Sequence, residues 1–223
     1  GRMRTLPKII AELSKPFPPE DIQWVPNRRD GTCPILPSID ARAVRERLDY
    51  VAALDIGLES WETSFREVNL GDMVQHTRSK DITVPVKGFV CTLSLTITND
   101  SGEKVIVKRE DVANLSDFEP FKGGLCGALK RAAVSFGIGT YLYHIPIVLG
   151  NVTNGRFETP KLPLFALPAG YIDEHPEYAT ATKSPSVNTE SNDSETYSES
   201  PGELTFPYGK FSGTPITSVS DKG

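Results

Sequence analysis

Residues 125–146 read LCGALKRAAVSFGIGTYLYHIP, and this stretch decides the fold. Plotted at 100° per residue together with the turn before it, its apolar side chains fall on a single arc, the pattern of a helix that buries one face. The arc comprises Phe121, Leu125, Ala128, Leu129, Ala132, Ala133 and Phe136. The opposite arc carries Gly123, Gly124, Gly127, Lys130, Arg131 and Val134. The stretch therefore predicts an amphipathic helix whose outer face bears glycines and two adjacent cations.

The glycines of this outer face are unusual, because each Gly inside a helix costs roughly 1 kcal/mol relative to Ala. Three of them on one face predict that another backbone or a ligand approaches closely there. Lys122 also precedes Lys130 by eight residues, which is about 12 Å along a helix and about two phosphate spacings of a nucleic-acid strand. An ordinary solvated helix face is the alternative, and spacing alone does not decide between the two.

Hydrophobic periodicity predicts the elements that precede this helix. Residues 5–14 and about 40–54 have helical spacing, and Asp40 is placed to cap the second helix. Residues 27–37 are expected to form a loop, and residues 69–83 a hairpin tip or an extra loop. Strands are expected at 61–68, 84–98 and 104–109, where apolar residues alternate. The predicted fold class is α+β, with an antiparallel β-β-β-α core preceded by N-terminal helices.

Charge is distributed unevenly along the 223 residues, whose formal net charge is −5. Residues 1–160 hold 20 Lys+Arg and 20 Asp+Glu, whereas residues 161–223 hold 4 and 9. A neutral domain does not coat nucleic acid through bulk charge, so any such binding requires cations concentrated on one surface. A small basic patch repeated in several subunits would meet that requirement.

The composition changes near Gly170 and suggests three parts. We expect a main domain over residues 1–170 and a disordered acidic linker over 171–204, because residues 180–202 are rich in Ser, Thr, Asn and Glu. Residues 205–223 contain FPYGKFSG, which weakly resembles the GK-aromatic-x-G motif of small modules appended to some nucleases. This segment is expected to be either a truncated module or a short peptide that docks on a partner.

Several classes of chemistry are not expected. The cysteines (Cys33, Cys91, Cys126) and histidines (His76, His144, His175) are scattered without CxxC or HxxxH spacing, so we expect reduced thiols, no metal and a cytoplasmic location. The sequence has no GxxxxGK[ST] run for ATP, no recognisable catalytic carboxylate cluster and no apolar run near the ~20 residues that cross a bilayer. We expect a protein that is not an enzyme and needs no cofactor.

The stretch LKRAAVSFGIGTYLYHIP resembles the signature helix and turn of the Rad52/Rad22 family of DNA annealing and double-strand-break repair proteins, in particular its bacterial and phage branch. Three further pieces match in the expected order, and the match covers about residues 5–148. These pieces are Trp24–Pro26, Ser38–Asp49 and Gly57–Phe65, the last containing Trp61. The resemblance implies a ring-forming homo-oligomeric domain that binds single-stranded DNA and anneals complementary strands without ATP.

The resemblance also implies site residues. Lys130 and Arg131 match the family's basic pair, Lys122 matches an earlier basic position, and Arg42 falls close to another family arginine. Val134 stands where eukaryotic members carry a further cation, so this chain is expected to have fewer phosphate contacts. Lys104, Lys108 and Arg109 are candidates on charge alone, and for them an ordinary surface role explains the charge equally well.

Two alternatives to annealing remain open at this point. One is passive protection of 3′ single-stranded ends without strand pairing, and the other is a nuclease-associated subunit suggested by residues 206–213. The acidic C-terminal tail suggests a single-strand binding protein or an exonuclease as a further partner. Tyr141 and Tyr143 could stack on bases, but a core or interface role of the YLY segment is the preferred interpretation.

Overall fold

The computed structural model describes residues 5–114 and 120–178, but not the side chains of 114 and 120–124. All of these residues belong to the first of two units into which the chain divides, residues 1–183. The expected acidic linker and C-terminal segment lie outside the described residues from 179 onward, so they stay predictions. The side chain of Lys122 and the surroundings of Gly123 and Gly124 are likewise outside the description.

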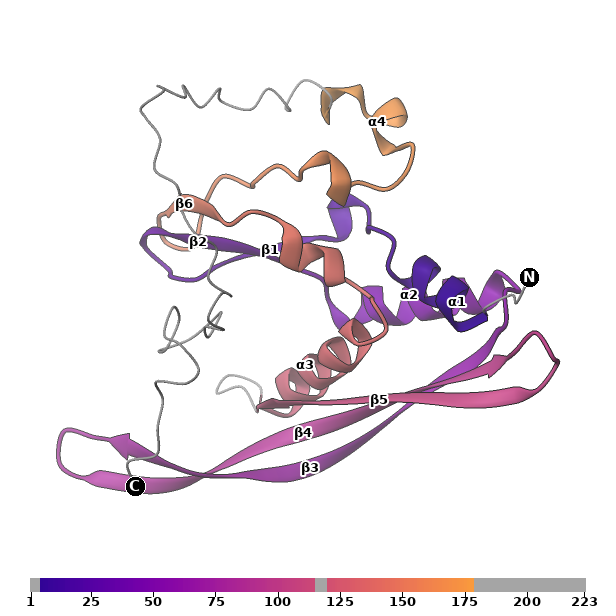
Figure 1. Ribbon diagram of the computed structural model, residues 1–223. Helices are drawn as coiled ribbons and strands as arrows, with labels where there is room; N and C mark the ends of the chain where they lie inside the picture. The colour runs from indigo at the N-terminus through magenta and orange to yellow at the C-terminus, as the bar shows by residue number, and fades with distance from the viewer. Residues whose placement is uncertain (1–4, 115–119, 179–223) are drawn as a thin grey trace, which may run out of the picture. The chain divides into compact units, whose positions relative to one another are not determined.

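The larger sheet is the predicted antiparallel meander. Its strands are β3 (Leu58–His76), β4 (Asp81–Thr98) and β5 (Lys104–Asn114), in the order β3-β4-β5 (Figure 1). Alternate residues of β4 are buried on the face toward the helices, including Cys91, Leu93 and Leu95 at 0% exposure. The turn between β4 and β5 is held by Asn99, whose side-chain oxygen accepts hydrogen bonds from the backbone N–H groups of Ser101 and Glu103.

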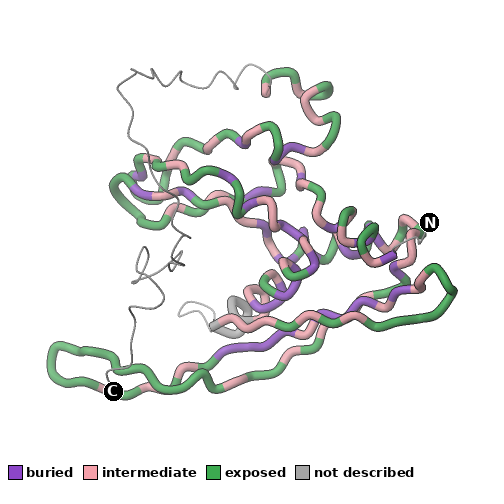
Figure 2. The backbone as a smooth tube through the Cα atoms, viewed as in Figure 1, coloured by how far each residue is buried: buried purple, intermediate pink, exposed green. Residues whose placement is uncertain are grey.

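The helix α3 (Pro120–Val134) packs on this inner face, against β4 and β5. Its predicted apolar arc is confirmed for the described side chains beyond Leu125. Ala128, Leu129, Ala132, Ala133 and Phe136 are all at 0% exposure. The buried core therefore runs between α3 and the sheet, as the burial colours show (Figure 2). The following turn passes through Gly137 at φ +93°, where a Cβ would overlap the Ser14 hydroxyl.

The two N-terminal helices are also confirmed, as α1 (Thr5–Leu13) and α2 (Ala41–Ala53). The carboxylate of Asp40 accepts a hydrogen bond from the backbone N–H of Ala43, so Asp40 caps α2 as predicted. One face of α2 is fully buried through Val44, Leu48 and Val51. Both helices contribute to the same core as α3.

A second sheet replaces part of the loop predicted at 27–37, and this prediction was wrong. Strands β1 (Gln23–Pro26), β2 (Gly31–Ser38) and β6 (Val148–Val152) form an antiparallel sheet in the order β1-β2-β6. Prolines at 34 and 37 concealed β2, because proline normally argues against a central strand. The partner strand β6 lies more than one hundred residues further along the chain, beyond the reach of local periodicity.

The hairpin tip expected within residues 69–83 is confirmed but is limited to residues 77–80, because the others continue the strands β3 and β4. The two strands pair as far as His76 and Asp81, beyond the last β4 residue that pairs with β5, Gly88. Register shifts between Leu58 and Ser60 and between Asn69 and Asp72 mark irregularities in β3. The polar character of this two-stranded arm reflects exposure on both faces rather than a loop.

The segment after β6 returns to the domain core. Leu162, Ala166 and Leu167 are buried, so the apolar segment at residues 162–167 packs on the domain core. The remaining short elements of the described chain are the 3-10 turns η1 (Pro19–Asp21), η2 (Thr140–His144) and η3 (Leu164–Ala166) and the helix α4 (Tyr171–Glu174). Tyr171 ties α4 to the N-terminal region by donating its hydroxyl hydrogen to Glu20 at 3.2 Å.

Candidate nucleic-acid interface

The cationic end of α3 lies beside the edge strand β5. Arg131 is exposed, and its Nε lies 3.4 Å from Oδ1 of Asp111 on β5. The side chains of Arg131 and Asp111 are 59% and 33% exposed, so this ion pair is in contact with water. Lys130, the preceding residue, is half-buried, and no ion pair joins it to another described residue. The last turn of α3 thus presents two cations, and among the described residues an ion pair is seen for Arg131.

Gly127 explains how α3 comes so close to β5. A Cβ at this position would lie 3.1 Å from the Cβ of Ala113, tighter than ordinary contact. Gly127 is four residues before Arg131 and so lies on the same side of the helix. The close approach predicted from the glycines is therefore, at Gly127, that of the chain's own strand.

Arg109 reaches the same region from the inner face of the sheet. It pairs across the strands with the buried Leu93, and directly opposed residues of antiparallel strands point to one face. Its guanidinium carbon lies 5.2 Å from the centroid of the Phe136 ring, within the range of a cation–π contact. Asp111, two residues further along β5, shares this face. Arg109, Asp111 and Arg131 therefore gather where α3 crosses β5.

Lys104 and Lys108 belong to the other face of the sheet. They are exposed and lie opposite Thr98 and Ser94, residues of β4 that alternate with the inner-face positions Leu93, Leu95 and Ile97. This face also carries Glu110, which accepts hydrogen bonds from Thr92 at 2.7 Å and from Arg66 at 2.6 Å. These two hydrogen bonds hold the pKa of Glu110 below its usual value. The structure therefore does not bring Lys104 or Lys108 together with Lys130 and Arg131.

The other two predicted positions are not joined to this group either. Arg42 is exposed in the first turn of α2, and no hydrogen bond or ion pair connects it to the described part of α3. Lys122 belongs to the first turns of α3, but its side chain lies outside the described residues. Both stay predictions.

Sequence reasoning missed two features of this surface. Asp111 was not singled out, because the predicted strand ended at residue 109, whereas β5 continues to Asn114 and so places Asp111 on the same face as Arg109. Arg78 and Lys80, exposed near the tip of the β3–β4 arm, were also not singled out, because residues 69–83 were expected to form only a hairpin tip or an extra loop. Lys87, which falls in the predicted strand at 84–98, is paired with Glu67 at 2.9 Å.

The two tyrosines near the end of the signature stretch have different surroundings. The hydroxyl oxygen of Tyr141 accepts a hydrogen bond from the backbone N–H of Phe17 at 2.9 Å, and burial raises the pKa of this tyrosine. Tyr141 therefore has the structural role that was preferred. Tyr143 is 66% exposed and leaves its ring accessible.

Within the part of the chain that the structure describes, no group of three or more His, Cys, Asp or Glu side chains could hold a metal ion. The same part contains no helix long and apolar enough to span a membrane. What the described residues do place together is a pair of cations on the last turn of a helix, a third on the adjoining strand and one carboxylate between them.

The fold and this cationic site define an α+β domain in which a basic helix end crosses an antiparallel meander. The profile of the Rad52/22 family double-strand break repair proteins matches residues 5–156. The chain belongs to this Rad52/22 family. It is 30% identical over 171 residues to a "Single-stranded DNA-binding protein DdrA" of Deinococcus radiodurans, covering 73% of this chain and 69% of the relative. A protein of the same name from Deinococcus deserti is 32% identical over 171 residues, covering 73% and 72%.

Proposed function

We propose that this protein binds single-stranded DNA and anneals complementary strands without ATP, using Lys130 and Arg131 as its main phosphate contacts. The observation that carries the proposal is the exposed cationic end of α3 beside β5, in a chain whose family repairs double-strand breaks. The names of the two Deinococcus relatives support the choice of a single strand as the ligand.

The chemistry required for annealing is limited. A protein that promotes annealing must neutralise phosphates without occupying the base edges, because base pairing supplies the free energy of the reaction. Lys and Arg at the end of α3 neutralise phosphates regardless of sequence. Binding is then independent of sequence and strongly dependent on salt, with log K falling by about 0.7 per phosphate neutralised for each unit of log salt.

Assembly into a homo-oligomer is part of the proposal, and the ring remains an expectation from the family. The main domain is neutral overall, so a single copy of the small cationic site gives weak binding, and many copies side by side give avidity. The β3–β4 arm offers a surface for such contacts, because Leu70, Met73 and Val74 are each more than 40% exposed on it. Exposed apolar side chains of this kind favour protein contacts.

A second candidate function is passive protection of 3′ single-stranded ends. The relatives' names favour it to the extent that they describe binding to single-stranded DNA and not annealing. A strand-annealing assay separates the two candidates. Two complementary oligonucleotides carry a fluorescence donor and an acceptor, and the rate of pairing is measured with and without protein. Binding without acceleration over the spontaneous rate would exclude annealing and leave protection.

The site itself is tested with Lys130→Ala combined with Arg131→Ala. If each bound subunit loses two phosphate contacts, the slope of log K against log salt becomes shallower by about 1.4 for each subunit. We therefore expect binding to be lost at moderate salt while assembly, measured by light scattering, is retained. The matched control is Lys104→Ala with Lys108→Ala, which removes the same charge from the opposite face of the sheet and should change the affinity by less than about twofold. Wild-type affinity in the α3 double variant would show that the site is wrong.

A further inference from the structure

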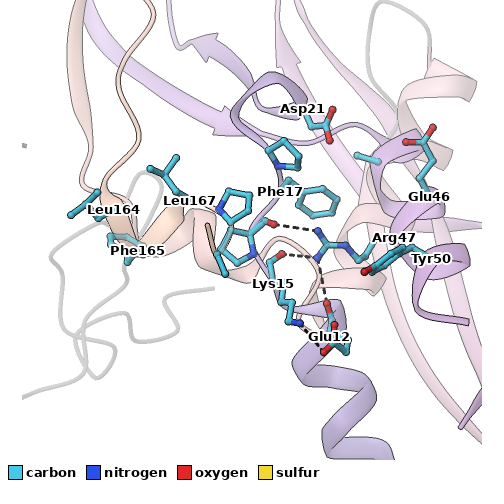
Figure 3. Close-up of a pocket in the computed structure, with 15 residues that line it drawn as sticks. Glu12, Lys15, Phe17, Asp21, Glu46, Arg47, Tyr50, Leu164, Phe165 and Leu167 are labelled. Atoms are coloured by element: carbon cyan, nitrogen blue, oxygen red, sulfur yellow. Dashed lines mark hydrogen bonds and ion pairs between the residues drawn. The ribbon is translucent and has the colours of Figure 1, made fainter. Parts of the chain in front are cut away.

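A cavity of about 780 Å³ lies away from the cationic site, between the N-terminal helices and the segment that follows β6. Its walls come from the end of α1, the turn at residues 16–18, the first part of α2 and residues 164–169. Figure 3 shows its two sides, with Asp21 and Glu46 on one side and Leu164, Phe165 and Leu167 on the other. The cavity therefore has an acidic side and an apolar side.

Arg47 makes the base of this cavity rigid. Its Nη1 donates to the carbonyl oxygens of Leu13 at 3.1 Å and Lys15 at 2.6 Å, and its Nη2 donates to that of Pro16 at 3.3 Å. The guanidinium carbon also lies 4.0 Å from the centroid of the Phe17 ring. These contacts direct the guanidinium toward the open end of α1, where unpaired carbonyls favour a cation. The guanidinium of Arg47 is therefore engaged by contacts within the protein.

The residues that line the cavity include three carboxylates (Glu12, Asp21 and Glu46) and two cations (Lys15 and Arg47), a net charge of −1. Lys15 is paired with Glu12 at 2.8 Å, which neutralises both. The carboxylates of Asp21 and Glu46 are exposed, and among the described residues neither makes a hydrogen bond or an ion pair. Two unpaired carboxylates on one rim repel the phosphates of DNA and attract a cation.

The opposite side is apolar and accessible. Leu164 and Phe165 are 48% and 53% exposed, and they project from a short turn whose neighbours Ala166 and Leu167 are buried in the core. The turn therefore presents two large side chains on a fixed backbone. An exposed apolar pair on a rigid support next to unpaired carboxylates is the arrangement that receives an amphipathic ligand.

We propose that this cavity is a docking site for a partner protein, occupied by an extended segment with one or two apolar residues flanked by Lys or Arg. The apolar residues contact Leu164 and Phe165, and the cations pair with Asp21 and Glu46. The partner contacts a different surface from the one that binds DNA. Its Lys or Arg residues supply the positive charge that pairs with the acidic rim, which the phosphates of DNA cannot do. This inference does not depend on annealing or on the α3 site.

The test uses fluorescein-labelled peptides and the full chain. The panel contains peptides in which Leu-Phe, Ile-Leu or Trp-Leu is flanked on both sides by Lys, with matched peptides in which Glu replaces Lys or Ser replaces the apolar pair. Binding is followed by fluorescence anisotropy at physiological salt. We expect the Lys-flanked apolar peptides to bind at least about tenfold more tightly than either matched set, a difference of about 1.4 kcal/mol. Absence of binding in the panel, or equal binding of the Glu-flanked peptides, would overturn the proposal.

Variants then locate the peptide. Asp21→Lys with Glu46→Lys, and separately Leu164→Ser with Phe165→Ser, should each weaken binding by at least about tenfold. The milder pair Asp21→Asn with Glu46→Gln covers the case in which charge reversal affects folding. The control pair Glu158→Lys with Glu62→Lys makes the same change in net charge at exposed positions outside the cavity and the β3–β4 arm, and it should leave peptide binding unchanged. Equal loss in this control would mean that net charge alone governs binding and would refute the site.

Two further readouts distinguish other occupants. If the cavity receives a second copy of this chain, the Leu164→Ser and Phe165→Ser pair will reduce the oligomer mass measured by light scattering, and the partner proposal fails. If it receives DNA, the Asp21→Lys and Glu46→Lys pair will change the affinity for single-stranded DNA, which also contradicts it. Unchanged mass and unchanged DNA affinity, together with lost peptide binding, support the proposal.

Discussion

The carboxylate of Asp111 should weaken DNA binding, so removing its charge should strengthen it. Arg131 cannot pair fully with a phosphate while its Nε lies 3.4 Å from Asp111. We therefore expect Asp111→Asn to increase the affinity for single-stranded DNA. Asn is nearly isosteric with Asp and keeps an oxygen able to accept the hydrogen bond from the backbone N–H of Val112, which is 2.7 Å long. The change is thus mainly electrostatic.

The size of the effect follows from two contributions. Breaking a partly exposed ion pair costs about 0.2–1 kcal/mol. A phosphate beside Arg131 would also lie roughly 7 Å from the Asp111 carboxylate, where repulsion between unit charges in water is about 0.6 kcal/mol. Both penalties vanish in Asp111→Asn. Together they amount to about 0.8–1.6 kcal/mol, so at low salt the affinity should rise by about four- to fifteenfold for each subunit that contacts DNA.

The assay is fluorescence anisotropy with a labelled oligothymidine, measured on a double-mutant cycle. In the Arg131→Ala background, Asp111→Asn should gain only the part due to direct repulsion, because there is no ion pair left to break. Glu110→Gln is the matched control, since Glu110 is the adjacent residue of β5 but pairs with Arg66 on the opposite face. An unchanged or weaker affinity in Asp111→Asn would refute the reasoning. An equal gain in Glu110→Gln would attribute the effect to net charge.

Two other predictions concern the fold that carries this site. Arg47→Met should lower the free energy of unfolding by about 2–4 kcal/mol in urea titrations, because it leaves the carbonyls at the end of α1 without their donor. The control is Arg45→Met at an exposed neighbouring position. Equal losses of stability in the two variants would contradict the role of Arg47. Burial raises the pKa of Cys91 from 9.0 to about 11, so the folded protein keeps a neutral thiol at a pH where the unfolded chain ionises. Its contribution to stability is therefore complete below pH 9 and is lost as the pH rises toward 11. The urea midpoint of Cys91→Ala should fall less over this interval than that of the wild type, and parallel curves would show that the thiol does not contribute.

The sequence predicted those parts of the fold in which a residue's role depends on near neighbours. The buried stripe of α2, the apolar arc of α3 and the alternation of β4 each repeat over one element, and all three are confirmed. The cap at Asp40 needed only a carboxylate at the start of a helical pattern. The strand β2 failed because its partner β6 is distant in the chain and its prolines oppose a central strand. Pairing over that separation leaves no periodic signal.

In the cationic site, too, the sequence predicts the features that depend on near neighbours and misses those that depend on packing between elements. The pair Lys130–Arg131 was visible as two cations on a non-core arc, and the structure leaves both side chains at least partly accessible. The position of Gly127 against Ala113 depends on how far α3 tilts toward β5, which spacing along one helix does not encode. Lys108 and Arg109 were both candidates on charge alone, although adjacent residues of a strand point to opposite faces of the sheet. Applying that rule would have separated Lys108 from Arg109, but Asp111 lay beyond the predicted end of the strand, whereas β5 continues to Asn114.

The arrangement of charges suggests why a neutral domain is suited to this function. The cations at the end of α3 and the unpaired carboxylates Asp21 and Glu46 belong to different surfaces, so each keeps its own field despite a net charge near zero over residues 1–160. None of the residues of the cationic site lines the cavity, and the ~8 Å Debye length of physiological salt limits the reach of each charge. DNA should therefore be selected by one surface and a basic peptide by the other, and added salt should weaken both. A uniformly basic domain would bind DNA more tightly but would repel the basic partner that we propose.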